Sequence, residues 1–218
     1  MYKPILFVSL LTMTALGWEQ GRPTAVVPLE GSKMILEWTP GKEAVVRITA
    51  ENEKELERVR IFRPDGQELV ELATESGGLT GLELELREPD LVRLLENYAN
   101  GPYTIHAAMV GGKLARGQAN LSLDLPAAPR VVHPRRGEFV QASNLTVYWL
   151  PDRSAAGYEL QLEQGEDDGL RVRLPPERSS FQVPRDFLLP GTRTTLEVTA
   201  IGANGNRTVA EVVFTTRP

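Results

Sequence analysis

Histidine is the side chain most often used as a general base or metal ligand, and the chain has two, His106 and His133. Residues 107–132 separate them, and they fall in different predicted units. A zinc site needs convergent ligands, and there is no cysteine to complete one. A serine nucleophile would be indicated by a Gly-x-Ser-x-Gly elbow, which the sequence lacks. We therefore predict no catalytic residue and no enzyme activity, and interpret His106 as a half-exposed strand residue.

Acidic side chains crowd one predicted loop, at Glu163, Glu166, Asp167 and Asp168. Oxygen-rich loops can bind calcium, but this one lacks the alternating Asp ligands and distal Glu of a calcium loop. A solvated hairpin tip explains the same residues without a ligand. We predict no metal site and no calcium-dependent stabilisation.

Phosphate and nucleic-acid sites are not indicated either. Gly77-Gly78 and Gly111-Gly112 do not precede predicted helices, so neither forms a phosphate cradle. Arg135-Arg136 is too small a basic spot for nucleic acid, and 24 Lys and Arg residues against 29 Asp and Glu give a net charge of -5. We predict no cofactor, no nucleic-acid partner and no binding to anionic membranes.

Aromatic rings could form a sugar-stacking platform. Trp38, Trp149 and Tyr158 are in phase with their apolar neighbours, which assigns them to cores. Tyr148 is out of phase with Trp149 and should face outward, where a single exposed tyrosine is ordinary.

The first residues have the composition of an export signal. Lys3 precedes the apolar run Ile5 to Leu16, and the small residues Ala15 and Gly17 stand two apart, as cleavage prefers. The run is about 14 residues, whereas a bilayer span needs about 20. We expect residues 1–17 to be a signal peptide, the mature chain to begin near Trp18, and the product to be periplasmic, on the cell surface or secreted. The absence of cysteine excludes a lipid anchor on an N-terminal Cys and suits a bacterial envelope.

The positions after Lys33 alternate between apolar and polar residues in short stretches, the pattern of antiparallel strands with one buried face. Turn residues separate them at Arg63-Pro64-Asp65-Gly66 and at Gly111-Gly112. Only Pro89 to Tyr98 has helical spacing, which predicts a short helix. The alternating apolar positions are Met34, Leu36 and Trp38, then Val46 and Ile48, then Leu82, Leu84 and Leu86.

Two prolines in Leu125-Pro126-Ala127-Ala128-Pro129 cannot donate to a central strand ladder, so this segment is the predicted boundary. The strand pattern restarts after it. We predict an all-β chain of two tandem sandwiches, an immunoglobulin-like one over 24–125 with a short helix and a second one over 126–218.

The second unit resembles a fibronectin type III domain along nearly its whole length. The resemblance rests on Pro129, on the strand Leu145 to Trp149 followed by Pro151, on Gly157 to Leu162 with Tyr158, on Phe181 to Pro184, on Leu188 to Thr192, on Leu196 to Ala200, and on the turn Asn204-Gly205-Asn206 before Val209 to Thr215. Thr194 occupies the place of that family's hydrogen-bonded corner tyrosine. In the first unit, Asn100 to Ile105 looks like such a corner, with Tyr103.

This resemblance implies a binding or spacer module and names no partner. We expect an exported, non-catalytic adhesion, scaffolding or binding module of the cell envelope whose partner is another envelope or extracellular protein. Two alternatives stay open, a periplasmic pilus-type assembly chaperone and a glycan-binding accessory domain. The first would complete a partner's fold with an exposed strand edge.

The acidic hairpin has a register that the apolar pattern constrains. Tyr158, Leu160 and Leu162 should share the core face with Val172 and Leu174, and opposed residues share a face. All five numbers are even, so opposed pairs must sum to an even number and the loop must hold an odd number of residues. We expect Asp167, Asp168 and Gly169 at its centre, with Gly169 at the positive-φ position, and Arg171 and Arg173 beside Glu159, Gln161 and Glu163.

Overall fold

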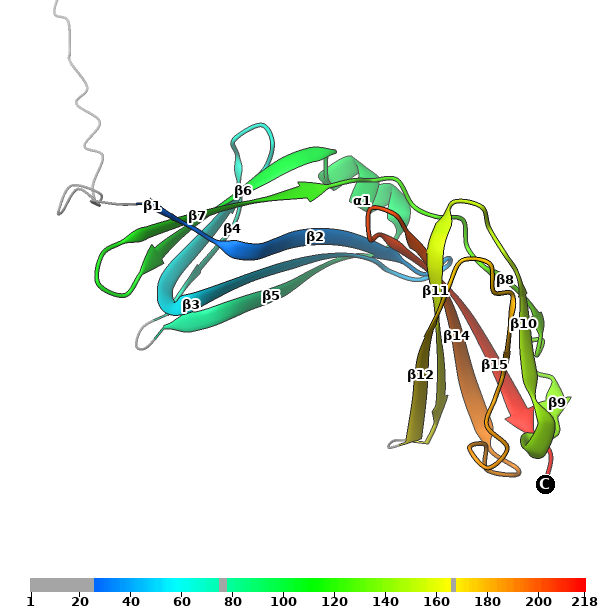
Figure 1. The fold of residues 1–218 in the computed structure, drawn as a ribbon. Coiled ribbons are helices and arrows are strands. Elements are labelled where there is room, and N and C mark those ends of the chain that lie inside the picture. The colour runs from blue at the N-terminus through cyan, green and yellow to red at the C-terminus, as the bar shows by residue number, and fades with distance from the viewer. Residues whose placement is uncertain (1–25, 75–77, 166–167) are drawn as a thin grey trace, which may run out of the picture.

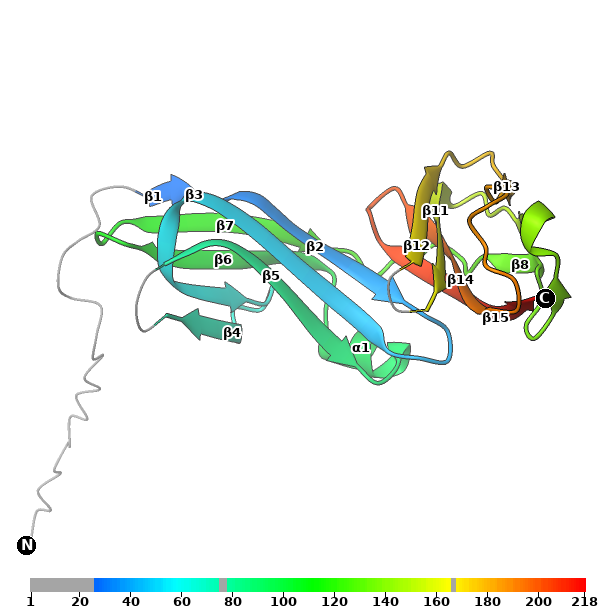
Figure 2. The ribbon, with the colours of Figure 1, turned by 90° about the horizontal axis from the view of Figure 1, so that it is seen from below.

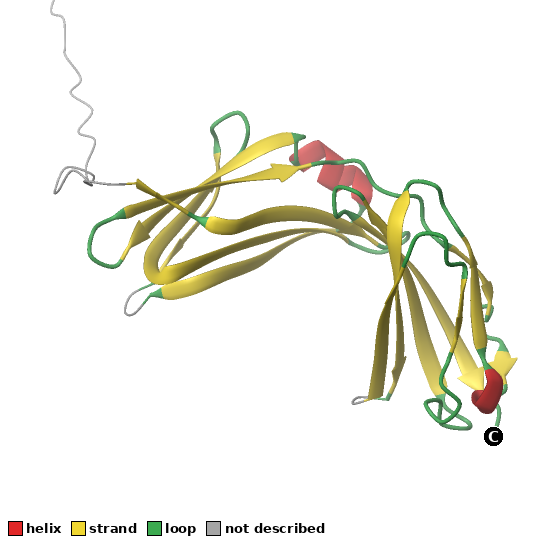
Figure 3. Cartoon of the chain, viewed as in Figure 1, coloured by secondary structure: helices red, strands yellow, loops and turns green. Residues whose placement is uncertain are grey.

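The computed structural model describes residues 26–74, 78–165 and 168–218 and confirms an all-β chain of two tandem sandwiches (Figures 1 and 3). The expected signal segment lies outside these residues. The first sandwich has one short helix, and the second has a 3-10 turn at Ala142–Asn144. The first contains β1 Val26–Pro28, β2 Glu30–Trp38, β3 Ala44–Phe62, β4 Glu68–Ala73, β5 Leu79–Glu88, α1 Leu91–Asn97, β6 Gly101–Met109 and β7 Leu114–Leu121. The second contains β8 Arg130–His133, β9 Phe139–Val140, β10 Thr146–Leu150, β11 Ala155–Gln164, β12 Asp168–Leu174, β13 Ser180–Gln182, β14 Arg193–Gly202 and β15 Arg207–Thr216.

β3 belongs to both layers of the first sandwich. Its first half pairs with β2 and β5, and its second half pairs with β4 and β6. The sheet continues from β6 to β7 and then to β1. The sequence pattern shows two separate alternating stretches here, but the structure joins them into one strand of 19 residues. The segment between them, Glu51 to Glu57, has no Gly or Pro to end a strand, and register shifts along it let the strand bend.

The expected helix is confirmed at α1, where the Asp90 carboxylate accepts the Arg93 backbone N–H and Leu94 is buried. The expected corner follows it. The Tyr103 hydroxyl donates to the Ala99 carbonyl oxygen and accepts from the Ala99 N–H, both at 3.3 Å. A buried tyrosine therefore holds the entry to β6. The two predicted turns are also confirmed, with positive φ at Gly66, Gly111 and Gly112.

The second sandwich places the three-stranded sheet β13-β10-β8 against the four neighbouring strands β12-β11-β14-β15. Trp149 and Tyr158 are buried between the sheets as expected, with ring centroids 5.5 Å apart. Tyr148 faces outward, also as expected. Trp38 in the first unit is only half-buried, because it lies at the end of β2 where the two units meet.

Two other side chains replace the missing corner tyrosine of the second unit. The buried Gln164 amide donates to the Thr194 hydroxyl at 2.8 Å and accepts the Leu189 N–H at 2.9 Å. The buried Thr216 hydroxyl accepts the Thr192 N–H and donates to the Leu189 carbonyl oxygen. These bonds fasten the loop that contains Leu189 and Thr192 to the ends of β11, β14 and β15.

The parity expected for the β11–β12 hairpin is confirmed, but the expected centre is wrong by two residues. Tyr158 pairs with Leu174 and Gln164 with Asp168, so three residues, 165–167, connect the strands. Gly165 has the positive φ, and Gly169 lies within β12 opposite Glu163. Parity alone cannot choose between this register and the expected one, in which each β11 residue would oppose a residue four positions later in β12. Glu166 and Asp167 lie outside the described residues.

A parallel pairing of β2 with β15 joins the two sandwiches into one continuous sheet (Figure 2). Glu37 pairs with Arg207 and Trp38 with Thr208. The next residue back, Asn206, is 1% exposed; its amide oxygen accepts the Leu36 N–H at 2.8 Å. Its amide nitrogen donates to the carbonyl oxygens of Ser122 and Asp124, both at 2.7 Å, and the buried Thr208 hydroxyl donates to Pro126 O. We call these contacts the seam.

Candidate anion site on the outer face of the first sandwich

Cross-strand register assembles a row of basic side chains on the outer face of β3, β6 and β7. Arg60 of β3 lies opposite His106 of β6, which lies opposite Arg116 of β7. We call these three residues the basic row. Two residues further along each strand, on the same face, a second row joins Arg58, Ala108, Leu114 and Val26. The face therefore places the basic row beside a second row that is apolar apart from Arg58.

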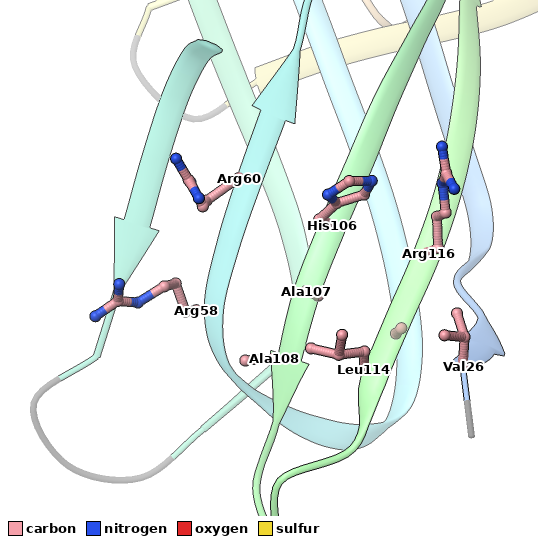
Figure 4. A pocket seen from close by; sticks show the side chains of 9 residues that line it. Val26, Arg58, Arg60, His106, Ala107, Ala108, Leu114 and Arg116 are labelled. Carbon is pink, nitrogen blue, oxygen red and sulfur yellow. The ribbon is translucent and has the colours of Figure 1, made fainter. Parts of the chain in front are cut away.

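The two rows line a hollow of 340 Å³. Figure 4 shows Arg60, His106 and Arg116 side by side across the strands, with Ala108, Leu114 and Val26 on the neighbouring row. A second hollow of 330 Å³ adjoins it, and the two share Val26 and Arg116. It is lined by β1 and by the adjoining residues of β6 and β7. An added Cβ at Gly117 would lie 2.4 Å from the Ser32 hydroxyl and 3.1 Å from the Leu29 Cβ, so glycine lets the segment that follows β1 lie close to β7.

The arginines of the site differ in their partners. Arg58 lies 3.0 Å from Glu71, and the Arg60 Nε donates to Glu68 at 2.7 Å; both carboxylates belong to β4. Arg58 extends toward that strand in Figure 4. Arg116 is exposed and, among the described residues, has no carboxylate within ion-pair distance. Within the part of the chain that the structure describes, Arg116 is therefore the arginine of the site without a carboxylate partner, whereas Arg58 and Arg60 are partly neutralised.

His106 is held in place by an aromatic neighbour. Its ring centroid lies 5.1 Å from that of Phe62, and the Arg60 guanidinium lies 5.2 Å from the centre of the same Phe62 ring. Burial lowers the pKa of His106, and the positive charges of Arg116 and Arg60 lower it further. The imidazole is therefore mostly neutral at pH 7.

The chemistry available at this site is binding. Guanidinium groups donate hydrogen bonds and accept none, and they match the planar geometry of carboxylates. The described part of the chain holds no group of three or more His, Asp or Glu side chains arranged for a metal ion.

The residues singled out from sequence do not converge. His133 lies beside Glu138, 3.3 Å away, in the second sandwich, whereas His106 lies in the first. Arg136 donates to the Glu211 carbonyl oxygen, which gives it a structural contact. Gly111 and Gly112 form the β6–β7 turn, and Gly78 precedes β5, while Gly77 is outside the described residues.

His106 was interpreted from sequence as a half-exposed strand residue; it lies in β6 and is exposed, but its arginine neighbours were missed. Alternation alone places Arg58 and Arg60 on one face, and it places His106 and Arg116 on outer faces of their strands. The missing information was the pairing register of β3, β6 and β7, which brings them into one row.

Searches for similar proteins find fold likenesses only. No family model matches the chain, and no curated protein matches it. A two-domain fibronectin type III segment of chicken tenascin is 15% identical and covers 85% of this chain and 99% of its own, with a TM-score of 0.34. The fibronectin(III)-like modules of CbhA from Clostridium thermocellum are 9% identical over 87% of this chain and 93% of theirs, with a TM-score of 0.36. The FN5 domain of Drosophila Lar is 21% identical over 43% of this chain and 98% of its own, with a TM-score of 0.32.

Strand order defines the class of fold. Each unit is an immunoglobulin-like β-sandwich of two packed layers around its own buried cluster. In the second unit, three strands face four, with the Trp149 strand in the smaller sheet and the Tyr158 strand in the larger. This arrangement is the fibronectin type III fold that the sequence resembles.

Proposed function

We propose that this chain is an exported, non-catalytic binding and scaffolding module of the cell envelope, in which the two sandwiches act as one rigid body. The seam is the observation that carries the proposal. Tandem domains joined by a linker normally move relative to each other unless the interface is extensive. Here main-chain pairing and the side-chain hydrogen bonds of buried Asn206 cross from one unit to the other.

Ion pairs add to the seam around Arg207, whose side chain is 18% exposed. Arg207 lies 3.5 Å from Glu37 of the first unit and 3.1 Å from Glu159 of the second. Lys42 of the first unit also pairs with Glu211 of the second. A scaffold that presents a surface at a fixed distance and orientation needs such a joint.

The export part of the proposal is supported by the sequence. Lys3, the short apolar run after it and the small residues at Ala15 and Gly17 are the features of a cleaved signal. Within the described residues, no helix is both long enough and apolar enough to cross a bilayer. The chain's lack of cysteine suits an oxidising bacterial compartment in which no disulfide framework is used.

A glycan-binding role is less well supported by the surface. The largely exposed aromatic side chains among the described residues are Phe139 and Tyr148. Phe139 is on β9, which pairs with β15, and Tyr148 is on β10 of the other sheet. They do not form one stacking platform.

Rigidity is tested by small-angle scattering and thermal unfolding of the full chain and of Asn206→Ala with Thr208→Val. We expect the wild type to scatter as one bent rigid particle and to unfold in one transition. The double variant should become more extended or variable in shape and unfold in two transitions. A wild type whose scattering fits only a freely jointed pair would contradict the rigid module.

Export is tested by expressing the full chain in a bacterium and measuring the mass of the product from the cytoplasm, the periplasm and the medium by mass spectrometry. The proposal expects a mass that begins near Trp18 in the periplasm or medium. Retention of Met1 in a cytoplasmic product would contradict it.

A further inference from the structure

We infer that the basic row binds a carboxylate side chain on an extended acidic segment of a partner protein. The aliphatic side chain two residues away on that segment lies on Ala108, Leu114 and Val26. This inference rests on the proposed function as a binding module and assigns its contact surface and the chemistry of its partner.

The first step is that stability does not explain the basic row. Arg60 and Arg116 lie directly opposite His106 on either side, and burial together with their positive charges disfavours a charged imidazole between them, so the members of the row gain no attraction from one another. On the opposite layer, Arg47 of β3 pairs with Glu85 of β5, and Arg87 of β5 pairs with Glu43, the residue before β3. Arg116 has no such partner among the described residues. An anion from another molecule would supply the missing charge.

The second step identifies the anion as a carboxylate next to an apolar group. The polar rim of the hollow consists of three arginines, which only donate hydrogen bonds, and one histidine, whose neutral ring has a single acceptor nitrogen, so the rim mainly suits a group that accepts. A sugar needs acceptors for its hydroxyl groups as well. An inorganic anion would leave the apolar row uncovered, whereas a peptide carries acidic and aliphatic groups on one chain.

The third step is geometric. The two rows are two residues apart on every strand, as Arg60 and Arg58, His106 and Ala108, and Arg116 and Leu114 show. Same-face side chains of an extended peptide recur at the same interval of two residues, about 6.5 Å. A segment lying along the strands, with Asp or Glu at one position and Leu, Ile or Val two positions later, therefore meets both rows.

The pKa of His106 shows whether a carboxylate occupies the basic row. The charged groups that face it are Arg60 and Arg116 on the adjacent strands and Arg58 in the next row, with Glu68 and Glu71 on β4 beyond them. The arginines hold its pKa down. A carboxylate placed between His106 and Arg116 favours the imidazolium, so binding raises this pKa.

The probe is a peptide with blocked ends, Gly-Glu-Thr-Leu-Gly, added to the full chain while the His106 ring is followed by NMR across pH. The matched control has glutamine for glutamate. We expect saturable binding of the glutamate peptide with a rise in the His106 pKa, and neither effect with the glutamine peptide. Arg116→Gln should weaken binding at least about tenfold, because a charge-assisted pair is lost. Arg93→Gln, which changes an exposed arginine on α1, should bind like wild type.

Arg116→Lys keeps the charge but loses the planar fork, so it should bind with intermediate affinity. Equal binding of the glutamine peptide, or unchanged binding by a folded Arg116→Gln variant, would overturn the inference. So would phosphate or glucuronate raising the His106 pKa as much as the peptide at equal concentration, which would show a general anion site. A failure here leaves the scattering and export results unaffected, so it is distinguishable from failure of the proposed function.

Discussion

The two arginine clusters of this protein differ in what surrounds them. At the seam, Arg207 is largely buried and forms ion pairs with Glu37 of the first unit and Glu159 of the second. Glu159 is itself 5% exposed and also meets Arg173 at 3.2 Å. On the outer face of the first sandwich, Arg116 is exposed and has no carboxylate within ion-pair distance among the described residues.

The difference in burial and pairing distinguishes charges that stabilise the fold from charges that are available to bind a ligand. A buried charge must be paired, because leaving it unpaired costs several kcal/mol. An exposed charge pays no such penalty and can remain free for a ligand. Substitutions at the two clusters should therefore change different measurements, stability at the seam and ligand affinity at the basic row.

The largest effect is expected at Asn206. Asn206→Ala should lower the free energy of unfolding by about 3 kcal/mol, because the buried Leu36 N–H and the Ser122 carbonyl oxygen lose this side-chain partner and the Asp124 carbonyl oxygen keeps only Asn204. Chemical denaturation measures this. Asn204→Ala is the matched control, since Asn204 bonds to Ser122 and Asp124 from an exposed position and water can replace it. Equal losses in both variants would show that the seam is not a buried polar joint.

Glu159→Gln is expected to cost about 1 to 2 kcal/mol, less than removal of a fully buried pair because Arg171 and Arg173 are well exposed. The substitution preserves shape and removes the charge that Arg207 shares. Denaturation at low and high salt measures it, with exposed Glu163→Gln as control. A loss no greater than the control's would mean that Arg207 is adequately paired by Glu37 alone.

At the basic row, Arg116→Gln should change stability by less than about 0.5 kcal/mol. It should also raise the pKa of His106, since one of the positive charges that lower this pKa is removed. NMR titration of the imidazole and a denaturation curve provide the two measurements. A destabilisation similar to that of Glu159→Gln would erase the distinction between the clusters.

The smallest effect is expected at Glu197, on the β14 strand beside the seam. Its pKa is raised, mainly by burial and then by the charges of Glu163, Glu211 and Glu37. The folded state therefore binds the proton more tightly than the unfolded state, and stability is lost as pH rises through the folded pKa. Glu197→Gln should be more stable than wild type by a few tenths of a kcal/mol at pH 7.5. The difference should shrink near pH 4, as melting curves at both values would show; a lower melting temperature for the variant at pH 7.5 contradicts it.

The sequence predicts elements well where the signal is local. Period-two alternation identifies the strand around Met34 and Leu36, and the Pro64-Asp65-Gly66 turn follows from backbone preferences. The Tyr103 corner and the odd-numbered β11–β12 loop are also confirmed, because each depends on neighbouring residues.

Features that depend on distant pairing escaped the sequence analysis. Leu36 and Asn206 are 170 residues apart, and nothing in either segment indicates that they bond. The basic row needs the joint register of three strands, so its members look like separate surface residues until β3, β6 and β7 are aligned. Gln164 and Thr216 likewise carry no sequence signal that they take the place of the corner tyrosine in the second unit.

The parallel pairing of β2 with β15 also determines how the molecule carries tension. β2 arrives at the seam with Trp38, and β15 leaves it with Thr208 toward the opposite tip. When force acts between the two ends of the molecule, the strand pairing, the Asn206 hydrogen bonds and the Arg207 ion pairs therefore hold the units together alongside the covalent linker.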